Sequence, residues 1–240
     1  MIESPYPLEQ SLGICYYLTD TPGIGGVLKK SPGDFIVDEI PAPLSGDGPY
    51  LIVRLTKENW DLQHAVKEIA KRLGMSHRRI GWAGTKDKRA ITTQFISIYN
   101  GDREQVERLH IKDLSLEVVG RSPAALSLGM LEGNRFDITI RECERDSLSE
   151  RVGSVAETIS HGIPNYVGLQ RFGVIRPITH RVGELILKED YKGAALGYIG
   201  EAFPHEPSDI RDARDAFSRT LDIKAALKGY PTHLSYERSM

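Results

Sequence analysis

The stretch Ile80-Gly-Trp-Ala-Gly-Thr-Lys-Asp-Lys-Arg-Ala-Ile-Thr-Thr-Gln-Phe-Ile-Ser-Ile-Tyr99 places a charged loop between two segments that have the composition of β-strands. Residues 80–83 form the short first segment, and residues 92–99 form the longer second segment, which is rich in β-branched and aromatic side chains. The loop between them runs from Gly84 to Arg89. Because functional side chains are commonly mounted on loops that a rigid scaffold holds, the sequence predicts a functional loop here.

The sequence around this stretch predicts more strands and two amphipathic helices. Strand composition or alternation occurs in four further segments: residues 34–40, 50–56, 115–119 and 135–141. Apolar residues at helical spacing predict helices over residues 61–73, ended by Gly74, and over residues 146–159. The residues of the second helix expected to face inward are Leu148, Val152, Val155 and Ile159. This order predicts an α+β fold with a mixed, largely antiparallel sheet flanked by helices.

The character of the chain changes near residues 161–165. Beyond this point four segments are predicted to be helical: residues 178–187, 192–197, 208–217 and 223–227. Three prolines separate or follow them, at positions 204, 207 and 231. We therefore expect one domain over residues 1–162 and a mostly helical domain over residues 163–240.

Positive charge is concentrated around the loop, although the chain of 240 residues has a formal net charge of −2. Residues 71–89 contain one acid, Asp87, and seven basic residues: Lys71, Arg72, Arg78, Arg79, Lys86, Lys88 and Arg89. Seven minus one leaves six positive charges in this segment, so the rest of the chain carries −8. Such asymmetry indicates a basic face suited to a polyanion, with a solvated charged surface as the alternative.

Several classes of protein are disfavoured by the sequence. It has no apolar stretch of the roughly 20 residues that a membrane span needs, and residues 1–21 lack the pattern of a secretion signal. Residues 21–26 are glycine-rich without the Lys-Ser/Thr of a phosphate loop. The histidines and the cysteines, Cys15 and Cys143, show no metal-ligand spacing. We expect a cytoplasmic protein with reduced thiols, no metal and no membrane partner.

Asp87 is the strongest candidate for chemistry. Its neighbours Lys86 and Lys88 favour an ionised carboxylate that can act as a nucleophile or a base, and they attract a polyanion. On these residues alone, an exposed charged turn is the alternative.

Four separated runs of sequence decide between these alternatives. They are Lys29-Lys-Ser-Pro-Gly-Asp-Phe-Ile-Val-Asp-Glu39, Gly81-Trp-Ala-Gly-Thr-Lys-Asp-Lys-Arg-Ala-Ile-Thr-Thr-Gln94, Leu128-Gly-Met-Leu-Glu-Gly-Asn-Arg-Phe136 and Pro164-Asn-Tyr-Val-Gly-Leu-Gln-Arg-Phe-Gly173. In this order they resemble the motifs of the TruD family of tRNA pseudouridine synthases. The resemblance implies the pseudouridine synthase fold and the isomerisation of a uridine in tRNA, expected at uridine 13 of the D-arm, without a cofactor.

The resemblance also implies roles for individual residues. Asp87 is expected to be the catalytic carboxylate and Lys29 the cation that pairs with it. Phe136 matches the position that stacks on the uracil, although its alternation with Ile138 and Ile140 also fits a core residue. Asn134 is expected to order the loop or meet the uracil edge. Further contacts to the substrate are expected from Arg78, Arg79, Lys86, Lys88 and Arg89.

Members of the TruD family are longer than this chain and contain an inserted domain, after which the chain returns to complete the catalytic sheet. Here the insertion is expected to begin near Asn165, and no returning segment is visible before Tyr236–Met240. The sequence is therefore expected to be truncated or to be one piece of a longer protein. We also expect a monomer. Two alternatives remain open: a non-catalytic RNA-binding module with the same fold, and an unrelated small-molecule enzyme that uses Asp87 as a base.

Overall fold

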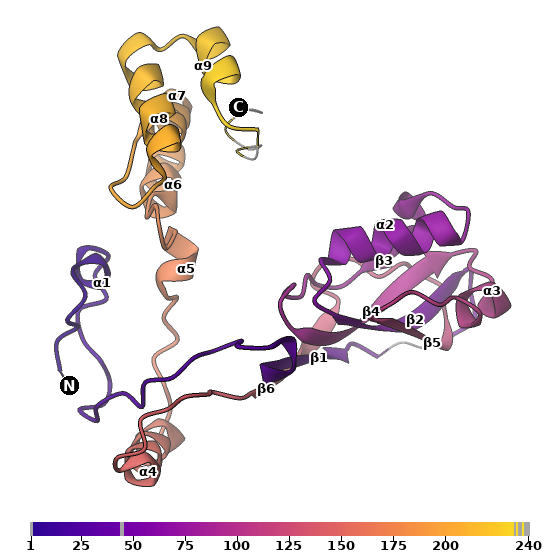
Figure 1. Cartoon of the computed structure of the whole chain (residues 1–240). Coiled ribbons are helices and arrows are strands. Elements are labelled where there is room, and N and C mark those ends of the chain that lie inside the picture. The colour runs from indigo at the N-terminus through magenta and orange to yellow at the C-terminus, as the bar shows by residue number, and fades with distance from the viewer. Residues whose placement is uncertain (1, 44–45, 233, 235–236, 238–240) are drawn as a thin grey trace. The chain divides into compact units, whose positions relative to one another are not determined.

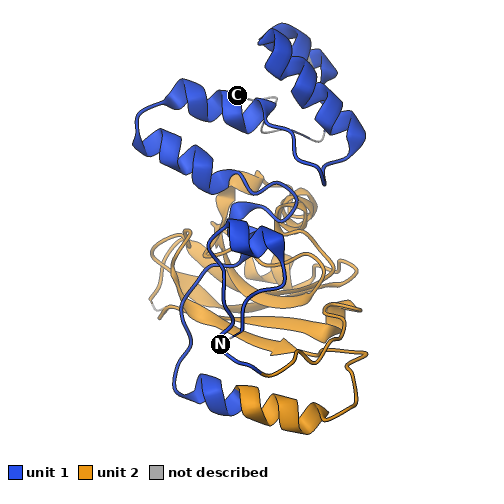
Figure 2. Cartoon of the chain, turned by 90° about the vertical axis from the view of Figure 1, so that its left-hand side faces the viewer, with its two compact units in different colours: residues 1–20, 156–240 blue, residues 21–155 orange. Residues whose placement is uncertain are grey.

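The computed structural model describes residues 2–43, 46–232, 234 and 237 (Figure 1). They divide into two compact units, shown in different colours in Figure 2: Thr21–Val155, and Met1–Asp20 together with Ala156–Met240. The sequence did not indicate that the first 20 residues belong to the same unit as the later helices. The predicted domains, residues 1–162 and 163–240, stay a prediction. The prediction that no returning segment precedes residues 236–240 is not tested at its end, because residue 236 and residues 238–240 lie outside the described residues.

The unit Thr21–Val155 is built on a six-stranded sheet. Its strands are β1 (Phe35–Pro41), β2 (Tyr50–Glu58), β3 (Ile80–Trp82), β4 (Ile91–Tyr99), β5 (Leu114–Ser122) and β6 (Leu131–Ile138). They lie in the order β5-β2-β4-β1-β6, and β3 pairs with β4. The β1–β4 pair is parallel and the other pairs are antiparallel. The predicted α+β fold with a mixed, largely antiparallel sheet is confirmed.

Helix α2 (Leu62–Arg72) covers one face of this sheet (Figure 1). It begins at Asp61, whose side chain accepts a hydrogen bond from the His64 amide, and Gly74 follows it with φ of +63°, a conformation suited to glycine. The apolar stripe of α2 packs on alternate residues of β2 and β4, which form the core with it. The main members of this core are Leu51, Val53, Leu55, Leu62, Val66, Ile69, Ile96 and Ile98.

Gly81 allows the short strand β3 to pack closely. A Cβ atom at position 81 would lie 2.4 Å from the Leu126 carbonyl oxygen and 2.9 Å from the Ser97 hydroxyl. At position 84 it would lie 3.2 Å from Lys86 Nζ. Both glycines therefore make room for neighbouring groups rather than supplying a left-handed backbone.

Two predicted elements differ from the structure. Strand β6 spans Leu131–Ile138 and not residues 135–141, because it pairs with β1 from Pro41↔Leu131 to Phe35↔Ile138, while Arg141 bridges Val27 separately. Helix α4 (Leu148–Ser160) was predicted. The prediction that four of its apolar residues face inward was wrong, because no residue of this helix is buried in the described part of the chain. Val152 and Ile159 are nearly half exposed. Helix α3 (Arg103–Glu107) was not predicted.

The other unit is helical. Its helices are α1 (Pro7–Ser11), α5 (Leu169–Phe172), α6 (Thr179–Leu187), α7 (Tyr191–Gly200), α8 (Ser208–Thr220) and α9 (Ile223–Gly229). The four predicted helices are confirmed as α6 to α9, whereas the short helices α1 and α5 were not predicted. No described helix in either unit combines the length and apolar character needed to cross a bilayer.

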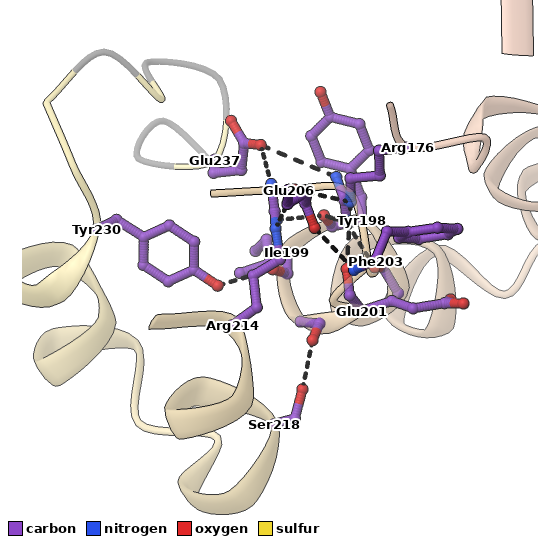
Figure 3. Close-up of polar contacts among 12 residues, drawn as sticks. Arg176, Tyr198, Ile199, Glu201, Phe203, Glu206, Arg214, Ser218, Tyr230 and Glu237 are labelled. Carbon is purple, nitrogen blue, oxygen red and sulfur yellow. Dashed lines mark hydrogen bonds and ion pairs between the residues drawn. The ribbon is translucent and has the colours of Figure 1, made fainter. Parts of the chain in front are cut away.

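A buried ion-pair network holds the helices α7 and α8 (Figure 3). The Arg214 guanidinium donates to Glu206 Oε1 at 2.9 Å, to Glu237 Oε1 at 2.8 Å and to the Ile199 carbonyl at 2.7 Å. Arg176 lies 3.8 Å from the same Glu206 oxygen. Because each buried charge has a partner of opposite sign, the network avoids the high cost of an unpaired buried charge.

Candidate active site

The predicted functional loop lies between β3 and β4, and its two ends are anchored in the protein. Ala83 and Ala90 are buried on either side of it. Within the loop, the Gly84 carbonyl accepts a hydrogen bond from Gln94 Nε2 at 3.1 Å. Asp87, in contrast, has a side chain that is 53% exposed. The loop thus presents its one carboxylate to solvent while its main chain is held from within.

Lys29 and Asp87 are in direct contact although they are far apart in sequence. Lys29 Nζ donates a hydrogen bond to Asp87 Oδ2 at 2.9 Å. The same ammonium lies 3.9 Å from the centre of the Phe35 ring, where a cation is attracted to the aromatic face. Lys29 has φ of +54°, in the left-handed region that non-glycine residues rarely adopt. Both contacts aim the ammonium at the exposed carboxylate. The catalytic roles of the two residues stay predictions.

The segment that carries Lys29 is fixed by the buried carboxylate of Asp34. Asp34 Oδ2 accepts hydrogen bonds from the Ser31 amide and hydroxyl, both at 2.9 Å, and Oδ1 accepts one from Arg141 Nε at 2.7 Å. The bond from Arg141, followed by the bond from the Ser31 amide, holds the pKa of Asp34 well below its usual range. The Asp34 carboxylate therefore links the turn after Lys29 to Arg141, which follows β6.

Phe136 lies on β6 beside Phe35 of β1. The two rings meet edge to face with their centroids 6.0 Å apart. Phe35 therefore contacts both the Lys29 ammonium and the Phe136 ring. Phe136 is 55% exposed, and Ile138 is 43% exposed. The interpretation of Phe136 as a core residue is therefore wrong for the described structure. An exposed aromatic face near a carboxylate and an ammonium is suited to receiving a planar base.

Asn134 lies two residues before Phe136 on the same strand. It is paired in register with Glu39 of β1 and is exposed. Alternation along a strand puts residues 134 and 136 on one face of the sheet. The structure thus brings Asn134 to the same side of β6 as Phe136.

The five basic residues expected to contact the substrate fall into two groups. Three are engaged with the protein: Lys86 is buried and pairs with Glu39 Oε2 at 2.6 Å, Arg79 Nε donates to the Tyr99 carbonyl at 3.0 Å, and Arg89 donates to the Lys30 carbonyl at 3.0 Å. The other two, Arg78 and Lys88, are exposed, and their side chains make no hydrogen bond or ion pair within the part of the chain that the structure describes. Arg78 and Lys88 are therefore the cations of this set whose hydrogen-bond donors are all available to a phosphate.

The sequence motifs assign no role to Glu39, Phe35 or Lys57. Glu39 fills a gap along β4, between the end of its pairing with β1 and the start of its pairing with β3, where its Oε1 accepts the Phe95 amide at 3.1 Å. Lys57 is fully buried on β2 behind the loop. The signal that would have found both is alternation: Glu39 follows Phe35 and Val37, and Lys57 follows Val53 and Leu55, at positions facing the core.

Metal ligands are not gathered in the described part of the chain: no group of three or more His, Cys, Asp or Glu side chains is placed to hold an ion there. The described site consists of a carboxylate, an ammonium, two aromatic rings and nearby basic residues.

The α+β domain carries a site suited to receiving a planar base beside a carboxylate. Comparison with known proteins identifies the family. The family model of tRNA pseudouridine synthase D (TruD) matches residues 11–240, so the chain belongs to this family. A protein of Methanosarcina barkeri named as a tRNA pseudouridine synthase D is 47% identical over 240 residues, which cover 97% of this chain and 54% of that protein. A protein of the same name from Archaeoglobus fulgidus is 42% identical, over 97% of this chain and 56% of its own length.

The fold is similar to that of a solved structure. The crystal structure of the Methanosarcina mazei protein titled as a tRNA pseudouridine synthase D has a TM-score of 0.81 and 45% sequence identity, and the match covers 95% of this chain and 54% of that one. The chain thus spans about half the length of the relatives it matches.

Proposed function

We propose that this protein isomerises a uridine of tRNA to pseudouridine, with Asp87 as its catalytic carboxylate. The observation that carries the proposal is the exposed Asp87 carboxylate, paired with Lys29 at 2.9 Å on a loop that is fixed from within. Membership of the tRNA pseudouridine synthase D family supplies the reaction and the substrate class.

The chemistry of the reaction fits these groups. The bond between N1 of the uracil and C1′ of the ribose breaks, the base turns over, and a bond forms between C5 and C1′. The proton on C5 is lost to solvent, and N1 takes up one proton in its place. Asp87 supplies a nucleophile or a base for these steps. Lys29 orients this carboxylate through a hydrogen bond from its ammonium group. The reaction is an isomerisation that leaves the composition of the RNA unchanged.

Binding of the substrate is proposed to involve the remaining residues of the site. A base inside a folded RNA must be flipped out before a carboxylate can reach it. We propose that Phe136 stacks on the flipped uracil and that Asn134 bonds to its edge. Arg78 and Lys88 would contact phosphates around it. The finer proposal, uridine 13 of the D-arm, is supported by the motif resemblance alone.

The proposal extends to the cellular location, the oligomeric state and the domain organisation of the protein. The two cysteines are free thiols, as is usual in a reducing compartment, so we propose a cytoplasmic enzyme. We further propose a monomer, with a catalytic domain over residues 1–162 and an inserted domain beginning at residue 163.

Tritium release tests the proposal. The protein is expressed from its complete reading frame and incubated with tRNA carrying tritium at C5 of its uridines. Turnover should release one tritium per uridine converted, and carbodiimide labelling with primer extension should then place the stop in the D-arm. Tight tRNA binding without tritium release would overturn the catalytic proposal in favour of a non-catalytic RNA-binding module.

A further inference from the structure

Lys57 breaks the apolar pattern of its strand directly behind the loop. Along β2, Leu51, Val53 and Leu55 face the core, and the next residue of this alternation is Lys57, which is 0% exposed. Its register partner is Thr92, at the start of the strand that leaves the loop. Burying an ammonium is costly unless its donors are satisfied, so an apolar residue would be the less costly choice for the fold alone.

The acceptors of Lys57 show what the buried ammonium holds. Lys57 Nζ donates to the carbonyl oxygen of Asp87 at 2.8 Å and to the carbonyl oxygen of Trp60 at 2.7 Å. Both acceptors are main-chain groups. Trp60 lies in the turn before α2, which is packed into the core. The ammonium therefore ties the main chain of Asp87 to the rigid part of the domain.

This tie acts on the direction of the Asp87 side chain. Because the backbone of a residue has only two soft dihedral angles, holding the Asp87 carbonyl oxygen in place limits rotation about its Cα–C bond. This limit narrows the positions that the Asp87 side chain can take. The Asp87 carboxylate is held from outside by Lys29 at 2.9 Å. Lys57 holds the same residue from inside. The other buried ties of the loop, Lys86 to Glu39 and Gln94 to Gly84, act on residues before Asp87.

The charge of Lys57 depends on its buried surroundings. Burial lowers the pKa of Lys57 to about 8, and the positive charge of Lys86 also lowers it, whereas the carboxylates of Asp61 and Asp87 oppose this shift. Because the folded-state pKa is depressed for a cation, Lys57 is charged at lower pH and loses its proton as pH rises through about 8.

We propose that Lys57 is a positioning residue for the reaction, whose buried ammonium fixes the main chain of Asp87 so that the carboxylate stays directed toward Lys29 and the substrate. The proposal rests on the proposed function, since it assigns a role to Lys57 in that same site. Lys57 itself touches no reacting atom.

Two variants on one strand test this role. Lys57→Met has similar length but no donor, and Leu55→Ala damages the same face of β2 without touching the loop. For Lys57→Met, kcat should fall at least about 10-fold, because small misplacements of a catalytic group are costly, while KM and tRNA affinity change less than about twofold. Leu55→Ala should lower the melting temperature by more while keeping kcat at temperatures well below unfolding.

The pH profile adds a readout that a purely structural role would not move. Wild-type kcat should fall as pH rises through about 8, and Lys57→Met should lack this fall. Lys57→Gln, which retains an N–H donor, should recover part of the lost kcat. A kcat for Lys57→Met within twofold of wild type, or a pH profile that it shares with wild type, would overturn the proposal.

A physical readout keeps the inference separate from the proposed function. Amide hydrogen exchange of residues 85–89 should be at least about 10-fold faster in Lys57→Met, with exchange in α2 unchanged. Equal exchange in both proteins would overturn the positioning role whatever the activity. An active wild type with a fully active Lys57→Met removes only this inference, whereas an inactive wild type removes the proposed function and the catalytic part of this one.

Discussion

Lys29 adopts its left-handed conformation at the point where its side chain meets Asp87. A non-glycine residue in this region costs about 1–3 kcal/mol, and a partly exposed ion pair contributes only about 0.2–1 kcal/mol. The contact between Lys29 and Asp87 therefore does not offset the strain by itself. Since strained residues of this kind gather at functional sites, the geometry at Lys29 is better explained by the direction of its ammonium than by stability.

Substitution of Lys29 should affect turnover, whereas substitution of its neighbour should not. Lys29→Met should lower kcat by about 10- to 100-fold, because it removes the cation that orients the Asp87 carboxylate. Lys30→Met is the matched control, since Lys30 is an adjacent exposed lysine that pairs with Glu142 instead. Tritium release from tRNA measures both. Similar losses in the two variants would mean that positive charge in this segment matters only for binding RNA.

The candidate site could be predicted from sequence only in part. The motifs indicated Asp87, Lys29 and Phe136, and the structure brings these three together through Phe35. The loop residue Lys86 could not be told from its neighbour Lys88, because its burial depends on Glu39, 47 residues away in sequence. Such long-range acceptors follow from strand register, which sequence patterns fix poorly.

At the scale of elements, the turn from Ser31 to Asp34 should make stability depend on pH. The pKa of Asp34 is lowered by Arg141 and Ser31. Because the folded-state pKa lies below the unfolded value of about 4, the contribution of Asp34 is fully present above about pH 4 and is lost as pH falls toward the folded-state pKa. The melting temperature of Asp34→Asn should thus lie well below that of wild type at pH 6, and the gap should narrow below about pH 4.

The exposed acid Asp47 provides the control for this experiment. Asp47→Asn should leave the melting temperature close to that of wild type at each pH. A gap between wild type and Asp34→Asn that stays constant from pH 6 into the acid range would contradict the assigned role of the Asp34 charge.

Elements with a clear period were predicted, and those without one were missed. Strand β2 and helix α2 each repeat their apolar residues several times, so the pattern identifies them. Helices α1, α3 and α5 have five residues or fewer, which is too short for a helical period to emerge. For helix α4, the period of the apolar residues predicted the helix correctly. It could not predict burial, because a stripe of apolar residues does not reveal whether another element covers it.

At the scale of the whole molecule, a net charge of −2 conceals the basic segment around the loop. The charge of Lys86 is compensated by Glu39, and Arg79 has donors committed to the Tyr99 carbonyl, whereas Arg78 and Lys88 have no such partner in the described structure. Replacing both Arg78 and Lys88 by Gln should therefore weaken tRNA binding and flatten its salt dependence. The slope of log Kd against log salt concentration should fall by about 1 for each phosphate that the variant no longer binds.

A second double variant tests whether this effect is local. Arg103 and Arg108 are exposed arginines on or beside α3 that pair with Glu107 and Glu104. Replacing both by Gln removes the same charge from another part of the domain. Fluorescence titration of labelled tRNA at several salt concentrations should give a slope unchanged from wild type. Equal changes in the two double variants would indicate binding by net charge and not by the face around Asp87.

The most direct test of the account compares turnover and binding in Asp87→Asn, which keeps the shape of the side chain and removes its charge. With the protein expressed from its complete reading frame, tritium release from C5-labelled tRNA should fall by at least about 1,000-fold, while the Kd for tRNA stays within about twofold of wild type. Release at the wild-type rate from Asp87→Asn, or a loss of binding as large as the loss of turnover, would contradict the assignment of Asp87 as the catalytic carboxylate.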